Sequence, residues 1–341
     1  MTELFQEVWR MLKLGIIGTH WITDQLLDAA AQNGHWQLTS VYSRDRQRAQ
    51  DYGQPHGATA FYDNLDDFFM NGDFDVVYVA SPNALHYRQV RQAIENDKHV
   101  IVEKPAFTNP DEFSQIEALL QAHPAVRLVE AARHIHTPLF KQVQAQLGQM
   151  ATIQGATLTF MKYSSRYDQV LAGEQSNVFS LDFAGGALQD LGVYPVYAAA
   201  ALFGEPNSVV YFPTMIETGA DGKGVAILTY DDFEVTLNFG KIANSHLPSE
   251  VYGLKDTLVM DNIADMTTAT YYDAEQTAHA LTAEVTENSM RPEIDAFTAL
   301  FEAPNDLNQL KNYETWFKLS RLVNSLLYTL RQSAGIKFPN E

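Results

Sequence analysis

The stretch Leu12-Lys13-Leu14-Gly15-Ile16-Ile17-Gly18 decides the first part of the fold. It is a short, mostly apolar run that ends in glycine, and apolar residues follow at Leu26, Leu27 and Ala30 with the spacing of a helix. The run predicts a buried strand, and its last glycine predicts a tight turn. Together they predict the first strand, turn and helix of an α/β domain.

Strand patterns and helical patterns continue to alternate as far as residue 131. Further strands are expected at 38–42, 75–80, 99–102 and 127–131. Helices are expected between them, at 46–52, 85–96 and 111–121. Strands that alternate with helices predict a parallel, doubly wound sheet, and we assign this domain to residues 11–132.

The pattern changes after Pro138 and a helix that ends near Gly148. Longer stretches rich in Thr, Tyr, Val and Phe predict strands at 152–163, 209–217, 224–230, 234–239 and 257–260. Helices are expected at 186–203, 291–302 and 312–333. Residues 133–341 are therefore predicted to form an α+β domain with a mostly antiparallel sheet. Residues 1–10 are an N-terminal extension to which we assign no role.

Composition limits the classes of function. The length of 341 residues exceeds one ordinary core, which agrees with two domains. The formal net charge of −19 repels phosphodiester backbones, so nucleic acid is not an expected partner. No apolar run approaches the ~20 residues that span a bilayer, and the start has no secretory pattern, so we expect a cytoplasmic protein without a membrane partner. Without cysteine, redox chemistry would need a bound cofactor.

The turn after the first strand has the place of a dinucleotide site but an incomplete fingerprint. The pattern G-x-G-x-x-G/A lets a helix N-terminus hold a pyrophosphate, whereas residues 18–23 read Gly-Thr-His-Trp-Ile-Thr. The imidazole of His20 obstructs the phosphates, turns away from them, or adds a donor if it is protonated. The turn alone leaves a dinucleotide site and an ordinary connection equally open. The candidate cofactor residues here are Gly18, Thr19, His20, Trp21 and Ile22.

The end of the second expected strand favours NADP over NAD. NAD sites place Asp or Glu at this position for the ribose hydroxyls, whereas Tyr42 is followed here by Ser43 and Arg44, which suit a 2′-phosphate. NADP is therefore the expected cofactor, with NAD as the second choice. The other interpretation is that Arg44 is one of several solvated charges in the run Ser-Arg-Asp-Arg.

Several segments together resemble the Gfo/Idh/MocA oxidoreductase family. The most specific is Val100-Ile101-Val102-Glu103-Lys104-Pro105. The resemblance extends upstream to residues 75–83 with His86, downstream to Glu130-Ala131, and to residues 185–195, Gly-Gly-Ala-Leu-Gln-Asp-Leu-Gly-Val-Tyr-Pro. The Asp-x-Gly-x-Tyr version of the last segment is similar to the branch with dimeric dihydrodiol dehydrogenases, glucose–fructose oxidoreductase and NADP-linked xylose dehydrogenases.

This resemblance implies a fold and an activity. It implies a Rossmann domain, and a C-terminal domain whose large open sheet forms a homodimer interface. It also implies oxidation of a sugar or a vicinal diol. Cofactor contacts are implied for Ser81, Pro82, Asn83, His86, Glu103 and Lys104. Catalytic and substrate-binding roles are implied for Lys104, Asp190 and Tyr194.

The implied residues suit alcohol oxidation, which removes a hydride and a proton. A tyrosine with a reference pKa of ~10 moves that proton near neutrality only if its pKa falls by about 2–3 units, and a nearby ammonium supplies about 1–3 units. Lys104 leaves the carboxyl end of a parallel strand, where such sheets bind ligands. Asp190 and Tyr194, four residues apart, share one helix face. The structural alternatives are a surface lysine paired with Glu103, a helix-capping aspartate and a core tyrosine.

Two histidines raise the question of a metal. His134 and His136 are expected on one side of a strand, but the sequence shows no third ligand, so we predict no metal. The pair is structural or lines the substrate pocket, which makes His134 a candidate substrate contact.

A binding or regulatory protein on the same fold is the alternative function. Such a protein would hold a dinucleotide or a sugar without turnover, and His20 is the feature that favours it. We favour the enzyme because Lys104, Asp190 and Tyr194 are all present.

Overall fold

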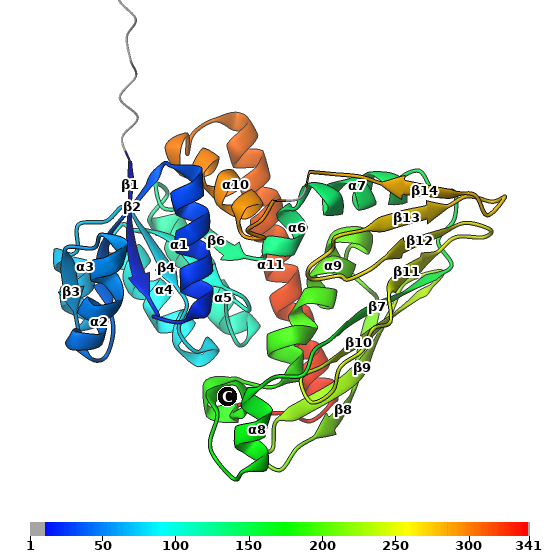
Figure 1. Ribbon diagram of the computed structural model, residues 1–341, viewed down its shortest axis with the longest axis horizontal. Helices are drawn as coiled ribbons and strands as arrows, with labels where there is room; N and C mark the ends of the chain where they lie inside the picture. Colours follow the sequence, from blue (N-terminus) through cyan, green and yellow to red (C-terminus); the bar gives the residue numbers. More distant parts are fainter. Residues whose placement is uncertain (1–10, 285, 340–341) are drawn as a thin grey trace, which may run out of the picture.

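The chain forms two sheets that lie side by side, joined by helices (Figure 1). The computed structural model describes residues 11–284 and 286–339, so the predicted extension at 1–10 lies outside the described residues. A six-stranded sheet has the order β3-β2-β1-β4-β5-β6, and an eight-stranded sheet has the order β14-β13-β12-β11-β7-β10-β9-β8. Among the described residues, no helix combines the length and the apolar character needed to cross a membrane.

The first sheet is parallel throughout, which confirms the predicted doubly wound domain. Its strands are β1 (Leu12–Ile17), β2 (Trp36–Tyr42), β3 (Ala60–Tyr62), β4 (Val76–Val79), β5 (His99–Glu103) and β6 (Leu128–Ala131). Its helices are α1 (Trp21–Asn33), α2 (Arg46–Gly53), α3 (Leu65–Asn71), α4 (His86–Glu95) and α5 (Pro110–Ala122), with short 3₁₀ turns η1 (Gln54–His56) and η2 (Asn83–Leu85). All four residues of β4 are buried, as expected for a central strand with helices on both faces.

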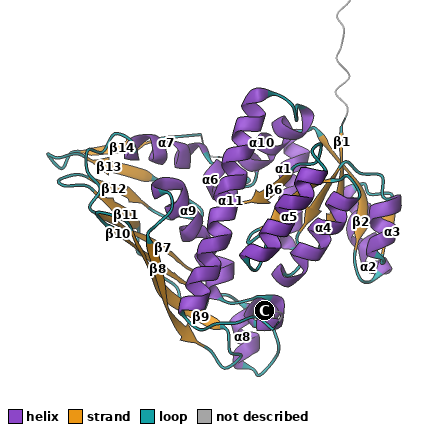
Figure 2. Ribbon diagram, turned by 180° about the vertical axis from the view of Figure 1, so that it is seen from behind, coloured by secondary structure: helices purple, strands orange, loops and turns teal. Residues whose placement is uncertain are grey.

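The second sheet is antiparallel except that β7 pairs parallel to β10. Its strands are β7 (Gly155–Met161), β8 (Ser208–Met215), β9 (Asp221–Thr229), β10 (Glu234–Gly240), β11 (Ser249–Tyr252), β12 (Thr257–Met260), β13 (Ala269–Tyr272) and β14 (Ala278–Leu281). The five predicted strands are present, and β11, β13 and β14 add to them. Helices α7 (Pro138–Leu147), α9 (Val193–Phe203) and α11 (Leu307–Ser333) lie along one face (Figure 2).

The chain returns to the first domain near its end. The apolar face of α10 (Arg291–Glu302) joins the core that α1 forms on the first sheet. Polar contacts also hold α10 against the first domain. Trp36 Nε1 donates to Thr298 Oγ1 at 2.7 Å, and His35 Nδ1 lies 2.6 Å from Glu302 Oε1. A domain boundary after residue 132 stays a prediction. Helix α10 lies beyond that boundary in the sequence, yet it packs on the first of the two sheets.

The predicted strand at His134 and His136 is wrong, because both residues lie on the one-turn helix α6 (Arg133–His136). Among the described residues, β6 pairs with β5 alone, and the last residues in register are Glu103 and Ala131. Within this part of the chain no strand lies beside the residues that follow Ala131, so their backbone groups are satisfied in a helical turn instead.

Candidate active site

The two domains meet at the carboxyl ends of the parallel strands. Lys104, one residue after β5, reaches Asp190 in the π-helical turn η5 (Leu188–Gly192) of the second domain. Asn83 Nδ2 donates to Ala184 O across the same boundary at 2.9 Å. Strand β1 lies between β2 and β4, which is the switch point where open α/β sheets bind ligands. The candidate site therefore lies between these strand ends and η5.

Lys104 is a buried cation at the centre of the site. Its Nζ donates to Asp190 O at 3.0 Å, lies 3.6 Å from Asp190 Oδ1, and stands 4.6 Å from the ring centre of Tyr194. Burial by itself lowers the pKa of the ammonium, but the electrostatic interactions with Tyr194 and Asp190 outweigh burial and raise the pKa above its ordinary value. Lys104 therefore stays protonated near neutrality and supplies a fixed positive charge.

Two glycines and a buried carboxylate shape the turn that presents Asp190. Asp221 Oδ2 accepts from Leu188 N and from the Tyr211 hydroxyl, both at 2.7 Å, at the start of η5. Gly186 has a φ of +128°, and a Cβ there would lie 2.0 Å from Asp221 Oδ1. A Cβ at Gly192 would similarly press on the ring of Phe239. Gly186 is thus required by the carboxylate that holds the turn, whereas a Cβ at its neighbour Gly185 would press on the backbone of Asn177 and Val178.

Asp190 is held between two lysines. Its Oδ2 lies 2.6 Å from Nζ of Lys241, which follows β10, and its Oδ1 faces Lys104. Burial raises the pKa of the carboxyl, but Lys241 and Lys104 outweigh it and lower the pKa to about 2. Asp190 is therefore ionised near neutrality and is a poor proton acceptor there.

Tyr194 begins its helix among cationic and aromatic groups. The guanidinium of Arg133 stands 5.7 Å from the ring centre, on which Lys104 also acts. His134 Nε2 lies 3.1 Å from Tyr194 O, and the two rings are tilted at 59° with their centres 5.0 Å apart. Burial and the charge of Arg133 lower the pKa of His134 to about 3. The neutral imidazole supports Tyr194 from behind, and contact of His134 with a substrate stays a prediction.

Sequence reasoning missed Arg133 and Lys241. Arg133 is fixed by Asp265 Oδ1 at 2.5 Å and by Ser289 Oγ at 2.6 Å, both from distant segments. Lys241 stands one residue past a strand, a place where lysines are usually solvated. In the sequence, the one feature that could have indicated a role for either residue is its position just after a strand.

The glycine turn is built for close backbone contact. Gly18 has a φ of +113°, and a Cβ there would lie 2.5 Å from Ala80 O on the neighbouring strand end. His20 takes the N-cap position of α1 with an ordinary extended φ of −125°, so no glycine is needed there for backbone reasons. Among the described residues, no side chain caps this helix. Thr23 N and Asp24 N donate to His20 O, so Trp21 N and Ile22 N are the first-turn groups placed to bind an anion. Trp21 is 66% exposed beside them, and Ile22 packs on the core.

His20 itself is neutral near neutrality. Partial burial is the largest cause that lowers the pKa of its imidazole, and the charges of Arg48 and Arg166 act in the same direction. A protonated imidazole that donates to phosphate, one of the three possibilities left open by the sequence, is therefore not favoured at neutral pH.

A second arginine joins the predicted Ser43 and Arg44. Arg48, in the first turn of α2, donates from Nε to Thr19 Oγ1 at 2.9 Å, and an open pocket lies between α2 and the glycine turn. Arg44 is exposed at the end of β2. Sequence reasoning missed Arg48, although the N-cap Asp45 determines where the first turn of α2 points.

Two family models match the chain. Residues 12–131 match the oxidoreductase family with an NAD-binding Rossmann fold, and residues 143–259 match the GFO/IDH/MocA C-terminal domain. The chain belongs to this oxidoreductase family.

Relatives and solved structures agree with the assignment. The chain is 34% identical to scyllo-inositol 2-dehydrogenase (NADP(+)) IolU of Bacillus subtilis (strain 168), over 96% of this chain and 99% of the relative. It is 31% identical to the oxidoreductase YgjR of Escherichia coli (strain K12), over 96% and 98%. Its fold is similar to that of KijD10, a 3-ketoreductase from Actinomadura kijaniata in complex with NADP, with a TM-score of 0.79, 21% identity and coverage of 95% and 98%.

Several predicted cofactor residues of this oxidoreductase lie beneath the surface of the site. The ring nitrogens of His86 lie 2.8 Å from Ser81 O and 3.1 Å from Pro105 O, so the imidazole joins the loops after β4 and β5. Glu103 accepts from the Tyr78 hydroxyl at 2.6 Å in the sheet interior. Pro82 precedes η2, and Asn83 bonds the second domain. Direct cofactor contact by these residues stays a prediction.

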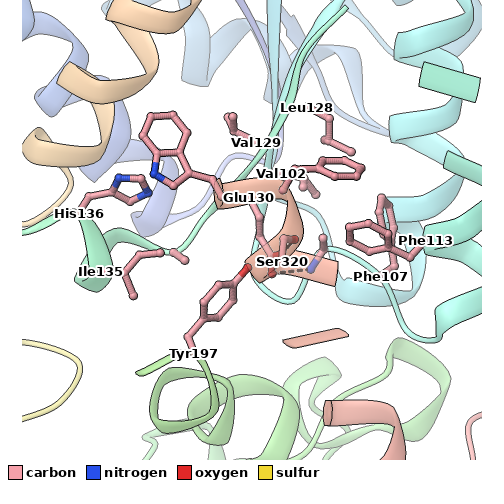
Figure 3. A pocket seen from close by; sticks show the side chains of 14 residues that line it. Val102, Phe107, Phe113, Leu128, Val129, Glu130, Ile135, His136, Tyr197 and Ser320 are labelled. Carbon is pink, nitrogen blue, oxygen red and sulfur yellow. Dashed lines mark hydrogen bonds between the residues drawn. The ribbon is translucent and has the colours of Figure 1, made fainter. Parts of the chain in front are cut away.

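Glu130 joins both domains beside a small cavity. Its Oε1 accepts from Ala106 N at 3.0 Å, and its Oε2 accepts from Ser320 Oγ on α11. Figure 3 shows the carboxylate pointing toward Ser320 and the hydroxyl of Tyr197, the residue one turn after Tyr194 on α9. Burial raises the pKa of Glu130 to about 7, although the hydrogen bond from Ser320 acts in the opposite direction.

Glu130 should make stability depend on pH. Because its pKa rises from 4.5 to about 7 on folding, its stabilising effect is full below pH 4.5 and is lost as the pH rises through 7. At 1.36 kcal/mol per pKa unit, the free energy of unfolding falls by at most ~3 kcal/mol through this group. In Glu130→Gln, the free energy of unfolding measured with urea should fall less between pH 5 and pH 8 than in the wild type. Glu314→Gln, an exposed carboxylate on the helix of Ser320, is the control. An equal fall in wild type and Glu130→Gln would contradict the assignment.

Proposed function

We propose that this oxidoreductase transfers a hydride between NADP and the hydroxyl-bearing carbon of a sugar, a polyol or a vicinal diol. The observation that carries the proposal is that Lys104, Asp190 and Tyr194, from both domains, meet at the carboxyl end of β5. The relative IolU, matched along nearly its whole length, is named as an NADP(+)-linked inositol dehydrogenase, which supports both the cofactor and a polyol substrate.

The residues of the first domain fit a phosphate-bearing dinucleotide. The uncapped N-terminus of α1 and the close backbone at Gly18 suit a pyrophosphate. Arg44 and Arg48 offer guanidinium groups near the end of β2, where a 2′-phosphate distinguishes NADP from NAD. Bound nicotinamide supplies the hydride acceptor or donor.

Tyr194 is proposed to move the proton. A base must take the hydroxyl proton of the substrate during oxidation, and Asp190, with a pKa of about 2, does not do so near neutrality. Negative charge on Tyr194 raises the pKa of Lys104, so the ammonium and a phenolate stabilise each other. Lys104 then also stabilises negative charge on the substrate oxygen, which lets Tyr194 act as the acid in the reverse direction.

A homodimer through the second sheet is proposed as the assembly. Among the described residues, α7, α9 and α11 lie on one face of this sheet (Figure 1). Phe212, which is 59% exposed, follows the buried Tyr211 on β8, so its side chain points to the other face. Apolar side chains on an uncovered sheet face mark an interaction surface, and a second copy of the chain is the partner that the family resemblance favours. The cytoplasm remains the proposed location.

Substitutions at the two proposed catalytic residues should abolish turnover without unfolding the protein. Tyr194→Phe removes the proton carrier and should lower kcat by about 10²–10⁴-fold. Lys104→Met removes the fixed charge and should lower kcat by about 10²–10³-fold. Turnover is followed by nicotinamide absorbance over a panel of sugars, polyols and diols, with circular dichroism as the folding check. Tyr272→Phe, on the distant strand β13, is the control, and near-normal turnover in either test variant would refute its role.

Arginine substitutions should separate the two cofactors. Arg44→Ala and Arg48→Ala should each weaken NADPH binding by about tenfold, or ~1.4 kcal/mol, while NADH binding changes by less than about threefold. Calorimetric titration of each variant with both cofactors measures this. Arg91→Ala, an exposed arginine on α4, is the matched control. If the binding of NADPH and of NADH were weakened equally, neither guanidinium would contact the 2′-phosphate.

The dimer proposal is tested by mass in solution. Light scattering of the wild type should give about twice the chain mass of 38.2 kDa. Phe212→Glu places a charge on the outer sheet face and should shift the equilibrium toward monomer, whereas Leu254→Glu, at the exposed turn before β12, should not. A wild-type mass of one chain at every concentration would exclude the dimer.

A further inference from the structure

Lys241 is a buried lysine that none of the motifs includes. Its side chain is 1% exposed, its Nζ lies 2.6 Å from Asp190 Oδ2, and it donates to Val178 O at 2.9 Å. The ammonium also stands 4.3 Å from the ring centre of Phe179. A lysine is rarely buried so completely unless its charge is paired, so the ion pair with Asp190 is what retains it.

The backbone of the turn has supports besides this ion pair. Asp221 already holds the start of η5 through Leu188 N, and the packing of Gly192 against Phe239 holds its end. Lys241 acts on the Asp190 side chain through the ion pair, and through Val178 O, which also accepts from Gly186 N at 3.1 Å, it contacts the backbone that leads into η5. A purely structural ion pair could form with any carboxylate nearby, whereas Lys241 pairs with the carboxylate that also faces Lys104.

The distances show how the Asp190 carboxylate is shared between Lys241 and Lys104. One carboxylate serves two ammonium groups, and it lies closer to Lys241, at 2.6 Å, than to Lys104, at 3.6 Å. Lys241 is sealed from solvent, whereas Lys104 keeps 13% of its side chain exposed. The incompletely neutralised positive charge thus rests on Lys104, at the place where the reaction is proposed.

We propose that Lys241 is a positioning residue that draws the Asp190 carboxylate away from Lys104 and so leaves the Lys104 charge available to the substrate oxygen. The proposal rests on the proposed function. Without Lys241, Asp190 would turn fully to Lys104 and neutralise it. Other charged groups that act on this cluster are Glu103, Arg133, Tyr194 and Asp221.

The test compares Lys241→Met, which keeps the length of the side chain without its charge, with Lys162→Met, an exposed lysine after the neighbouring strand β7. Both are full-length proteins. Carbon-13 NMR of aspartate-labelled protein, with the Asp190 signal assigned by Asp190→Asn, follows the titration of this carboxyl without cofactor or substrate. The midpoint should rise by about one pH unit or more in Lys241→Met and stay unchanged in Lys162→Met.

Kinetics give the second readout. In Lys241→Met, kcat should fall by about tenfold or more at neutral pH, while NADPH affinity stays within about twofold. In the Asp190→Asn background, Lys241→Met should have little further effect on kcat, because the carboxylate charge that Lys241 draws away from Lys104 is then absent. If Lys241→Met folds poorly, Lys241→Gln keeps a donor to Val178 O and takes its place.

Each result has one meaning. An unchanged Asp190 midpoint, or an undiminished kcat, in the folded Lys241 variant would overturn the proposal. Equal losses in the two backgrounds would also overturn it, because they would show a merely structural lysine. If the wild type oxidises no sugar, polyol or diol, the proposed function fails, and the NMR titration still decides whether Lys241 controls Asp190.

Discussion

The carboxylate of Asp190 lies between two ammonium groups that belong to different domains, and the site depends on this bridge. Lys104 comes from the end of a parallel strand in the first domain and Lys241 from the end of a strand in the second. Each of these charges would be costly if it were buried without a partner. Lys241 and Asp190 pair within the second domain, whereas the buried charge of Lys104 gains Asp190 as a partner only when the two domains meet. That contact also brings Tyr194 to Lys104.

The backbone around this bridge is held by buried polar side chains. Asp221 fixes the start of the turn that carries Asp190, and His86 joins the two loops of the first domain that flank Lys104. Glu130 holds Ala106 N on one side and α11 on the other. Because these groups bond protein atoms, the loops have their positions set before any ligand binds. Such preorganisation is what gives fixed charges their effect on a developing negative charge.

The cofactor turn shows which part of a fingerprint is physically required. Gly18 is confined by Ala80 on the next strand and by its own positive φ. The next fingerprint position holds His20 in an extended conformation that suits any residue, so the backbone of the turn forms without its usual second glycine. The uncapped helix behind it retains the anion-binding character that the fingerprint describes.

The sequence by itself determined the alternation of the first domain, the helix that carries Tyr194, and the place of Lys104, because these follow from periodicity and from neighbours along the chain. Most strands of the second sheet were predictable for the same reason. The π-helical turn that carries Asp190 before this helix was not predictable in the same way. Only the tertiary structure decided that α10 completes the first core, and that the chain turns helical after β6, where no further strand is available. It also decided that three cations of unremarkable sequence context belong to the site, because their partners are distant in the chain: Arg48, Arg133 and Lys241.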